Sequence, residues 1–343
     1  MTDPYQQTID ALARCKRVLI TTHVRPDGDA LGTSAALSLG LKKKGIDSQV
    51  LLLSHLPRKY AFIFQDYQIP FLDVENGWPA GGFDLDPFDA ILVADTGTWS
   101  QLPGLEERIA NWPKPKLVLD HHLTQQDWAD VKLVATDAAA AAEVAAELLD
   151  AWGIEFDQPI ATALYLGIVT DTGWFQFSNT RPQTLRLAAR LMEAGVETDR
   201  MYQALYQNER AERVALHTRG QQSLDLLEDG RLAVITLRKR DFEETRAGVL
   251  DTENLINVPL QIRTVDVSIL VVEPADGAGP VRVSLRSKGA VDVARFAETL
   301  GGGGHARASG LKLDGMGLEQ ARRVVVNTMS EWMRNQRVTN AAG

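Results

Sequence analysis

The first half of the chain alternates short apolar runs with a longer helical pattern. Residues 17–22 and 49–53 are predicted strands, and residues 30–44 between them have the spacing of a helix. Two further apolar runs, residues 90–94 and 116–119, continue the alternation. This order predicts an α/β fold with a mostly parallel sheet flanked by helices, in which ligands bind at the carboxyl ends of the strands.

Helical patterns dominate the middle of the chain, and β-rich segments return after residue 230. The later segments are predicted strands at 232–237, 265–272 and 281–285 and a closing helix at 318–333. We therefore expect a first domain over residues 1–195, a helical linker over 196–228, and a smaller α+β domain over 229–343.

The charge and the apolar runs limit the class of protein. The net charge of −9, from 36 basic and 45 acidic residues, argues against a protein that coats long nucleic acid. The charge is also uneven, at −11 over residues 1–228 and +2 over 229–343. No apolar run approaches the roughly 20 residues that span a bilayer. Because the single Cys15 has no internal disulfide partner, we expect a cytoplasmic protein with no membrane partner.

A short polar motif lies between the first predicted strand and the first predicted helix. It contains His23, Asp27 and Asp29 within seven residues, and Pro26 and Gly28 favour a tight turn that would direct these side chains inward. Imidazole and carboxylate groups together suit manganese. The simpler alternative is a polar loop in which Asp29 caps the following helix.

Other apolar segments also end in acids or imidazoles. Asp95 follows one strand, Asp120, His121 and His122 follow another, and Asp171 ends a third apolar segment before a glycine. Each has a common structural explanation by itself, namely surface histidines or an aspartate in a turn. Their repeated position at the ends of apolar segments favours a shared site.

Together these elements resemble the DHH phosphoesterase superfamily. The segments Ser284–Ser287 and Gly301–Gly310 resemble its DHH-associated C-terminal substrate-binding domain, so the resemblance covers nearly the whole chain. Within the superfamily, the chain is most similar to the bacterial nano-RNase family of bifunctional oligoribonucleases and pAp phosphatases.

The resemblance implies two Mn²⁺ ions, with Mg²⁺ or Co²⁺ as substitutes. One ion would take His23, Asp27 and Asp95, and the other would take Asp29, Asp95, His121 and Asp171. In the same pattern two catalytic residues assist, because Asp120 would orient His121 and His122 would contact the substrate phosphate.

The glycine-rich segment of the second domain is the predicted substrate site. Arg286 offers a planar donor pair, and the glycines offer backbone N–H groups that a phosphate can approach closely. A flexible linker is the alternative explanation for four consecutive glycines. The predicted substrate-binding residues are Arg286, Ser287, Gly302, Gly303, Gly304 and His305.

The implied activity is hydrolysis of short oligoribonucleotides to mononucleotides, and of 3'-phosphoadenosine 5'-phosphate (pAp) to AMP. The expected partners are short RNA or DNA oligonucleotides and small nucleotides, and a homodimer remains open. The nearest alternative is a phosphodiesterase of cyclic or linear signalling dinucleotides such as cyclic di-AMP, pApA or pGpG. The sequence motifs do not choose between these two activities, because both use the same metal chemistry. A general single-strand exonuclease and a catalytically inactive nucleotide sensor are weaker alternatives, and the sensor fits poorly because every expected ligand position is filled.

Overall fold

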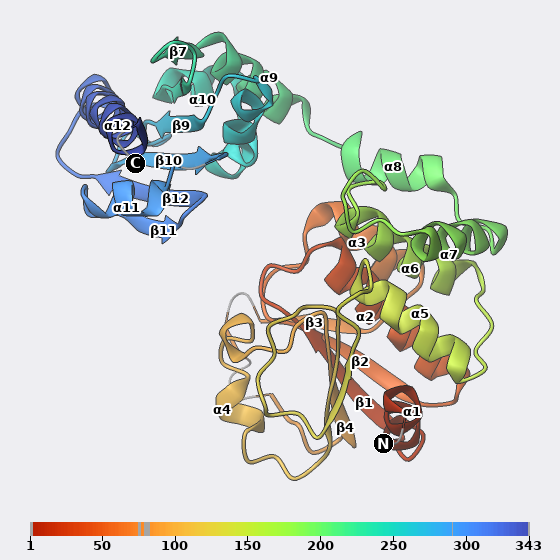
Figure 1. The fold of residues 1–343 in the computed structure, drawn as a ribbon. Helices are drawn as coiled ribbons and strands as arrows, with labels where there is room; N and C mark the ends of the chain where they lie inside the picture. The colour runs from red at the N-terminus through yellow and green to blue at the C-terminus, as the bar shows by residue number, and fades with distance from the viewer. Residues whose placement is uncertain (1–2, 75–76, 79–82, 290, 342–343) are drawn as a thin grey trace. The chain divides into compact units, whose positions relative to one another are not determined.

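The computed structural model describes residues 3–74, 77–78, 83–289 and 291–341. The chain divides into two compact units, Met1–Asn208 and Glu209–Gly343, each with its own sheet (Figure 1). The first unit is a parallel α/β structure and the second is a smaller unit with a mixed sheet, which confirms the predicted fold class.

The sheet of the first unit has six strands, all parallel, in the order β3-β2-β1-β4-β5-β6. Because the connections run outward from β1 and β4 in opposite directions, the topological switch lies between these two strands. The strands are β1 (Arg17–Thr22), β2 (Asp47–Leu52), β3 (Phe71–Asp73), β4 (Ala90–Ala94), β5 (Lys116–Asp120) and β6 (Val131–Val134).

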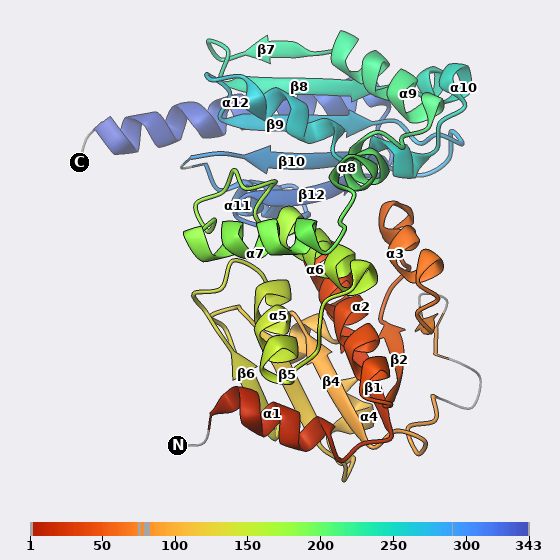
Figure 2. The same cartoon turned by 90° about the vertical axis from the view of Figure 1, so that its right-hand side faces the viewer.

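Both faces of this sheet are buried, as expected for parallel strands. Val18 and Ile20 of β1 join the core under the helices in front of the sheet in Figure 2, whereas Leu19 joins a second core with Phe88 and Trp112 on the other face. The helices of the unit are α1 (Pro4–Leu12), α2 (Gly28–Lys43), α3 (Ala61–Asp66), α4 (Glu106–Ile109), α5 (Ala141–Ala151), α6 (Gln158–Asp171), α7 (Pro182–Glu193) and α8 (Thr198–Tyr206).

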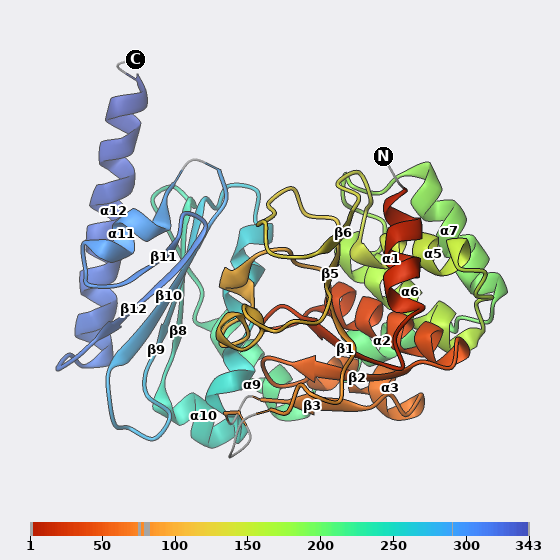
Figure 3. The same cartoon turned by 90° about the horizontal axis from the view of Figure 1, so that it is seen from below.

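The second unit has a sheet in the order β11-β12-β10-β9-β8-β7, in which only the β8–β9 pair is parallel. Helices α11 and α12 cover one face, and α9 and α10 lie on the other side (Figure 3). The elements are α9 (Ala211–Gln222), β7 (Asp225–Leu227), β8 (Leu232–Leu237), α10 (Lys239–Thr245), β9 (Val267–Val272), β10 (Val281–Ser287), α11 (Val293–Glu298), β11 (Gly303–His305), β12 (Ala308–Leu313) and α12 (Leu318–Ala341).

The stretch predicted as a helical linker is divided between the two units. Met201 and Leu205 of α8 are buried in the core of the first unit, whereas Leu216 of α9 is buried in a core of the second unit. β7 pairs with β8 as an edge strand of the second sheet. The structure places the boundary at Asn208 and Glu209 because the buried residues of α8 and of α9, on either side of it, belong to different cores.

Among the described residues, no helix is both long enough and apolar enough to span a membrane.

Candidate metal centre

Three neighbouring strands of the first sheet lead into the site. β1 is followed by His23, β4 by Asp95, and β5 ends at Asp120, just before His121. Since the strands are parallel, their carboxyl ends lie at one edge of the sheet, at the switch between β1 and β4. Asp95 has a φ of 61°, so the chain turns at the end of β4 in a conformation that aspartate tolerates better than most residues.

Two helices bring in the remaining acids. The Asp27 carboxylate caps α2 by accepting from the backbone N–H of Asp29 and of Ala30, each at 3.0 Å. Asp29 therefore lies in the first turn of α2, and Asp171 is the last residue of α6. The two helices approach closely, because a Cβ on Gly32 would lie only 2.4 Å from the carbonyl oxygen of Ala163 in α6.

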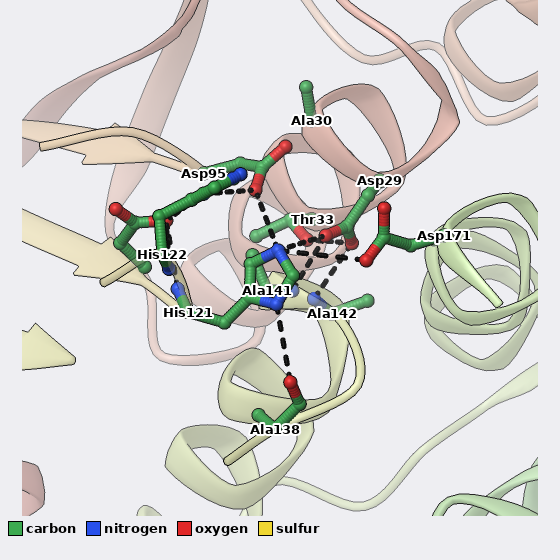
Figure 4. A network of polar contacts seen from close by, with 12 residues as sticks. Asp29, Ala30, Thr33, Asp95, His121, His122, Ala138, Ala141, Ala142 and Asp171 are labelled. Carbon is green, nitrogen blue, oxygen red and sulfur yellow. Dashed lines mark hydrogen bonds and ion pairs between the residues drawn. The ribbon is translucent and has the colours of Figure 1, made fainter. Parts of the chain in front are cut away.

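The ligand atoms form two groups. In the first, His23 Nε2 lies 3.4 Å from Asp95 Oδ2 and 3.9 Å from Asp27 Oδ1. In the second, His121 Nε2 lies 3.6 Å from Asp95 Oδ1, 3.6 Å from Asp171 Oδ2 and 3.8 Å from Asp29 Oδ2 (Figure 4). Groups of His23, Asp27 and Asp95, and of Asp29, His121 and Asp171, each offer ligand atoms within 4.8 Å of one another.

Asp95 lies between the two groups, with one carboxylate oxygen directed at each histidine. Its side chain is 3% exposed, and Oδ1 is buried without a hydrogen-bond donor among the described residues. A buried, unpaired carboxylate oxygen is unfavourable, and a cation would satisfy it. The donor set of imidazole and carboxylate therefore fits divalent metal ions on both sides of Asp95.

Backbone carbonyls orient the two histidines. His23 Nδ1 donates to the carbonyl of Val24 at 3.0 Å, and His121 Nδ1 donates to the carbonyl of Ala138 at 3.2 Å. Since a carbonyl oxygen only accepts, the proton of each neutral ring is on Nδ1. Nε2 of each ring is then free to bind a metal.

Asp29 is fully buried and does not cap its own helix. Its carboxylate accepts from the backbone N–H of Ala141 at 2.6 Å and of Ala142 at 2.9 Å, at the start of α5, and from the Thr33 hydroxyl at 3.2 Å. The capping alternative therefore applies to Asp27 on α2, whereas Asp29 caps a helix more than 100 residues later in the sequence.

Three acids of the cluster, Asp29, Asp95 and Asp171, hold protons more tightly than exposed carboxyls do. Burial, reinforced by the charges of Asp171 and Asp27, raises the pKa of Asp29 to about 7. Burial and the neighbouring carboxylates Asp29 and Asp27 raise the pKa of Asp95 well above its ordinary value, and burial also raises that of Asp171. Such mutual repulsion is what bound cations relieve.

Asp120 contacts a different histidine ring from the predicted one. Its Oδ1 accepts from Nδ1 of His122 at 2.8 Å, whereas it reaches His121 only at the backbone N–H, also at 2.8 Å. The expectation that Asp120 orients the His121 ring is therefore wrong in this structure, because that ring is held by Ala138. His122 also forms a possible ligand group with Asp95 and His121, but one of its nitrogens is already bound to Asp120.

The Asp120–His122 pair carries a strong electrostatic coupling. The hydrogen bond from His122 to Asp120 raises the pKa of His122 to about 9. Burial by itself raises the pKa of Asp120, but the hydrogen bonds from His122 and Gln125 outweigh it, so the pKa lies below its ordinary value. His122 is therefore positively charged at neutral pH, and its side chain is 56% exposed.

A cavity of about 390 Å³ opens over these groups. The lining residues are His23, Asp27, Asp95, Thr96, Gly97, Thr98, Ser100, Gln101, His122, Thr124 and Asp171. The hydroxyl groups of Thr96, Thr98 and Ser100, in the segment after β4, were not predicted from the sequence. The only sequence signal for them is their position directly after Asp95, at the carboxyl end of a strand.

A second set of residues missed by sequence reasoning holds the loop behind His121. The buried Glu143 accepts from the backbone N–H of Ala139 at 2.7 Å and from Arg181 at 3.2 Å. Asn179 Nδ2 donates to the carbonyls of Ala139 at 2.9 Å and of Asp171 at 3.1 Å. Glu143 lies within a run of alanines, and no local motif distinguishes it.

The predicted substrate residues of the second unit occupy both faces of its sheet. Arg286 is part-buried on the face opposite α11 and α12, with Nη1 donating to the carbonyl of Leu285 at 3.1 Å. Ser287 is buried on the other face, where its hydroxyl donates to the carbonyl of Val291 at 2.7 Å. Its position differs from the prediction because neighbouring residues of a strand point to opposite faces. Ser284 instead shares the face of Arg286.

The glycine run is ordered rather than a free loop. Gly303, Gly304 and His305 form the edge strand β11, paired with β12. Gly302 donates its backbone N–H to the carbonyl of Ala297 at 2.8 Å, and a Cβ there would lie 2.4 Å from the carbonyl oxygen of Gly310. The glycines thus allow close packing of this edge, and His305 is exposed.

Comparison with known proteins agrees with this architecture. Residues 17–168 match the DHH family, N-terminal domain, and residues 233–335 match the DHHA1 domain. The bifunctional oligoribonuclease and PAP phosphatase NrnA of Thermus thermophilus is 31% identical over 328 residues, covering 92% of this chain and 89% of the relative. The protein of the same name from Bacillus subtilis is 26% identical over 303 residues, covering 86% and 89% respectively.

A solved structure shares the fold over nearly the full length. The exopolyphosphatase-related protein from Bacteroides fragilis superposes with a TM-score of 0.79 at 23% identity, over 97% of each chain. The identity to the Thermus relative over most of both chains confirms the resemblance seen in the sequence. The chain therefore belongs to the DHH family of phosphoesterases, which are hydrolases of phosphate esters, and it carries a DHH domain followed by a DHHA1 domain.

Proposed function

We propose that this protein is a two-manganese phosphoesterase that hydrolyses short oligoribonucleotides to mononucleotides and converts pAp to AMP. The observation that carries the proposal is the position of Asp95, whose two oxygens face separate ligand groups at 3.4 Å from His23 and 3.6 Å from His121. A carboxylate shared in this way is the arrangement that a two-metal site requires.

The residues divide into two sets of ligands. His23, Asp27 and Asp95 would hold one ion, and Asp29, Asp95, His121 and Asp171 would hold the other. Two such ions supply an activated water and neutralise the charge on the phosphate. Serine or cysteine nucleophiles have no role in this proposal.

His122 is the proposed phosphate contact. The hydrogen bond to Asp120 keeps it protonated, and it lines the cavity beside Asp95. A charged imidazole there would bind a non-bridging phosphate oxygen or protonate the leaving alcohol oxygen. Asp120 acts through His122, so it is a positioning residue rather than a ligand.

The proposed substrate class is supported by the charge and by the relatives. The printed names of the Thermus and Bacillus relatives combine oligoribonuclease and PAP phosphatase activities, which supports the same pair of activities here. The net charge of −9 argues against the extended basic track that a long single strand requires. Arg286 and His305 of the second unit are the proposed contacts to the remainder of a short substrate.

The test compares substrates on one preparation of the full chain. Metal is removed with a chelator, and Mn²⁺, Mg²⁺ or Co²⁺ is restored before kcat/KM is measured on a diadenylate, pAp, cyclic di-AMP and a 24-nucleotide strand. We expect the highest values with Mn²⁺ on the diadenylate and pAp. A higher kcat/KM on cyclic di-AMP would favour the signalling-dinucleotide alternative, and equal values on the 24-nucleotide strand would indicate a general exonuclease.

Bis-p-nitrophenyl phosphate separates an enzyme from a binding protein. This small diester needs only the metal centre, so its manganese-dependent hydrolysis excludes an inactive sensor. Failure to hydrolyse it in the presence of bound manganese would contradict the proposed chemistry.

A further inference from the structure

The register of the second sheet places residues in rows across its strands. On the face opposite α11 and α12, one row runs His305, Ala308, Arg286 because β11 pairs with β12 and β12 pairs with β10 at these positions. Two residues further along β10 and β12, Ser284 lies beside Gly310. Paired residues of neighbouring strands project on the same side of a sheet, so these rows share one face.

The next row on this face holds two positive side chains side by side. Arg282 of β10 pairs directly with Lys312 of β12, and both are exposed. Directly opposed residues of an antiparallel pair have Cβ atoms about 5 Å apart, and like charges at that distance are unfavourable. Nothing in the fold of the unit requires positive charge at both positions.

The pair also lacks counter-ions. Among the described residues, neither Arg282 nor Lys312 forms an ion pair or a side-chain hydrogen bond, whereas Arg231, Arg238 and Arg322 of the same unit pair with Asp266, Glu319 and Asp225. Two adjacent cations without a carboxylate are a binding place for an anion such as phosphate.

We propose that Arg282 and Lys312 form a second phosphate site, which holds a further phosphodiester of a short oligonucleotide whose first phosphate lies at Arg286 and His305. The inference rests on the proposed function, because it assumes that this face binds substrate. Arg282 and Arg286 are four residues apart on one strand, or about 14 Å at roughly 3.4 Å per residue. The two positions therefore contact different phosphates of one ligand, and affinity rises with substrate length until both are occupied.

The experiment measures binding separately from hydrolysis. Dissociation constants are determined by fluorescence anisotropy for labelled, 5'-phosphorylated phosphorothioate adenylates of two and four nucleotides, with the manganese-loaded full chain. The variants are Arg282→Ala with Lys312→Ala, Arg282→Lys, and Arg323→Ala. Arg323 is an exposed cation of α12, which packs on the opposite face of the sheet, so its variant controls for the loss of one of the two positive charges that the double variant removes.

The wild type should bind four nucleotides more tightly than two. We expect this gain in affinity to be about fivefold smaller in the double variant, because two exposed ion contacts contribute about that much. The slope of log Kd against the logarithm of the salt concentration should fall by about 0.7 for the tetranucleotide, since each neutralised phosphate of a single strand contributes roughly 0.7. Arg282→Lys should retain most of the gain, and Arg323→Ala should retain all of it. Arg286→Ala should weaken both lengths alike.

Two results would overturn the inference. One is an unchanged ratio of the two dissociation constants in the double variant, and the other is an equal loss in Arg323→Ala, which would reduce the effect to net charge. Competition identifies the occupant. If inorganic tripolyphosphate displaces the labelled tetranucleotide as effectively as an unlabelled tetranucleotide does, the occupant is not specifically a nucleotide. Because binding is measured directly, absence of nucleotide hydrolysis would contradict the proposed function without deciding this inference.

Discussion

Replacing Asp120 with Asn should remove the charge that keeps His122 protonated. The asparagine oxygen can still accept from the backbone N–H of His121 and from the His122 ring. The asparagine NH2 group would replace the oxygen that accepts from Gln125 Nε2, so the Gln125 amide must turn to present its oxygen, which has no partner among the described residues. The pKa of His122, now about 9, should fall towards its ordinary value of 6.5. At pH 8 the protonated fraction would then fall from roughly nine-tenths to about one-thirtieth. We therefore expect a loss of about 30-fold in rate at pH 8.

The assay is a pH–rate profile for diadenylate hydrolysis between pH 6 and pH 9. At pH 6 both the wild-type and the variant histidine are mostly protonated, so their rates should differ by less than about twofold. NMR titration of the metal-free protein measures the pKa of His122, and the His122→Gln variant assigns its signal. Manganese content, measured at both pH values, should be the same in both proteins.

A loss of equal size at pH 6 and pH 8 would refute this reasoning, because it would indicate damage to the site rather than deprotonation of His122. Stability gives an independent check. Since the folded pKa of His122 is raised, its stabilising contribution is complete below about pH 6.5 and is lost as the pH rises through about 9. Asp120→Asn should therefore lower Tm more at pH 6 than at pH 10, by a small amount because the ring is more than half exposed.

Three further predictions concern the metal centre and its packing. Asp95→Ala should abolish hydrolysis of bis-p-nitrophenyl phosphate, since it removes the carboxylate shared by both ligand groups, and activity near the wild-type level would contradict the assignment. Gly167→Ala should lower the free energy of unfolding in urea by about 1–3 kcal/mol, because the new Cβ would lie 2.4 Å from Ala142 Cβ and 2.6 Å from Asp29 Oδ1; an unchanged midpoint would mean that α6 shifts freely. In the metal-free protein Tm should fall between pH 5 and pH 7, because the raised pKa of Asp29 makes the folded state bind more protons than the unfolded state, and saturating Mn²⁺ should abolish this fall.

The local sequence pattern was sufficient to predict the four central strands of the parallel sheet, but the short edge strands β3 and β6 were not predicted. β1 and β4 match the predicted runs, and β8 of the second sheet begins and ends at the predicted residues. The site residues could be grouped because parallel strands bring their carboxyl ends to one edge. His23, Asp95 and His121 lie together for this reason, and Asp171 was grouped with them because it also ends an apolar segment, which the structure shows to be the helix α6.

The remaining features depend on contacts that no local pattern contains. The pairing of Asp120 with the His122 ring, rather than the His121 ring, follows from the turn after β5 and from the carbonyl of Ala138, 17 residues further along the chain. Ser287 lies on the opposite face from Arg286 because side chains alternate along a strand. The sequence would have predicted this once Arg286 was assigned to the outward face. The supporting Glu143 is identified only by the loop that it holds.

Asp29 shows how this fold holds a carboxylate ready for metal in a fully buried position. Two backbone N–H groups at the start of α5 and the Thr33 hydroxyl offset part of the cost of burying its charge. One of its oxygens still lies 3.8 Å from Nε2 of His121, within the second ligand group. The amides are not sufficient by themselves, because burial and the neighbouring acids keep the pKa at about 7. A cation is the remaining partner, so the packing of α2 against α5 and the affinity for metal depend on the same side chain.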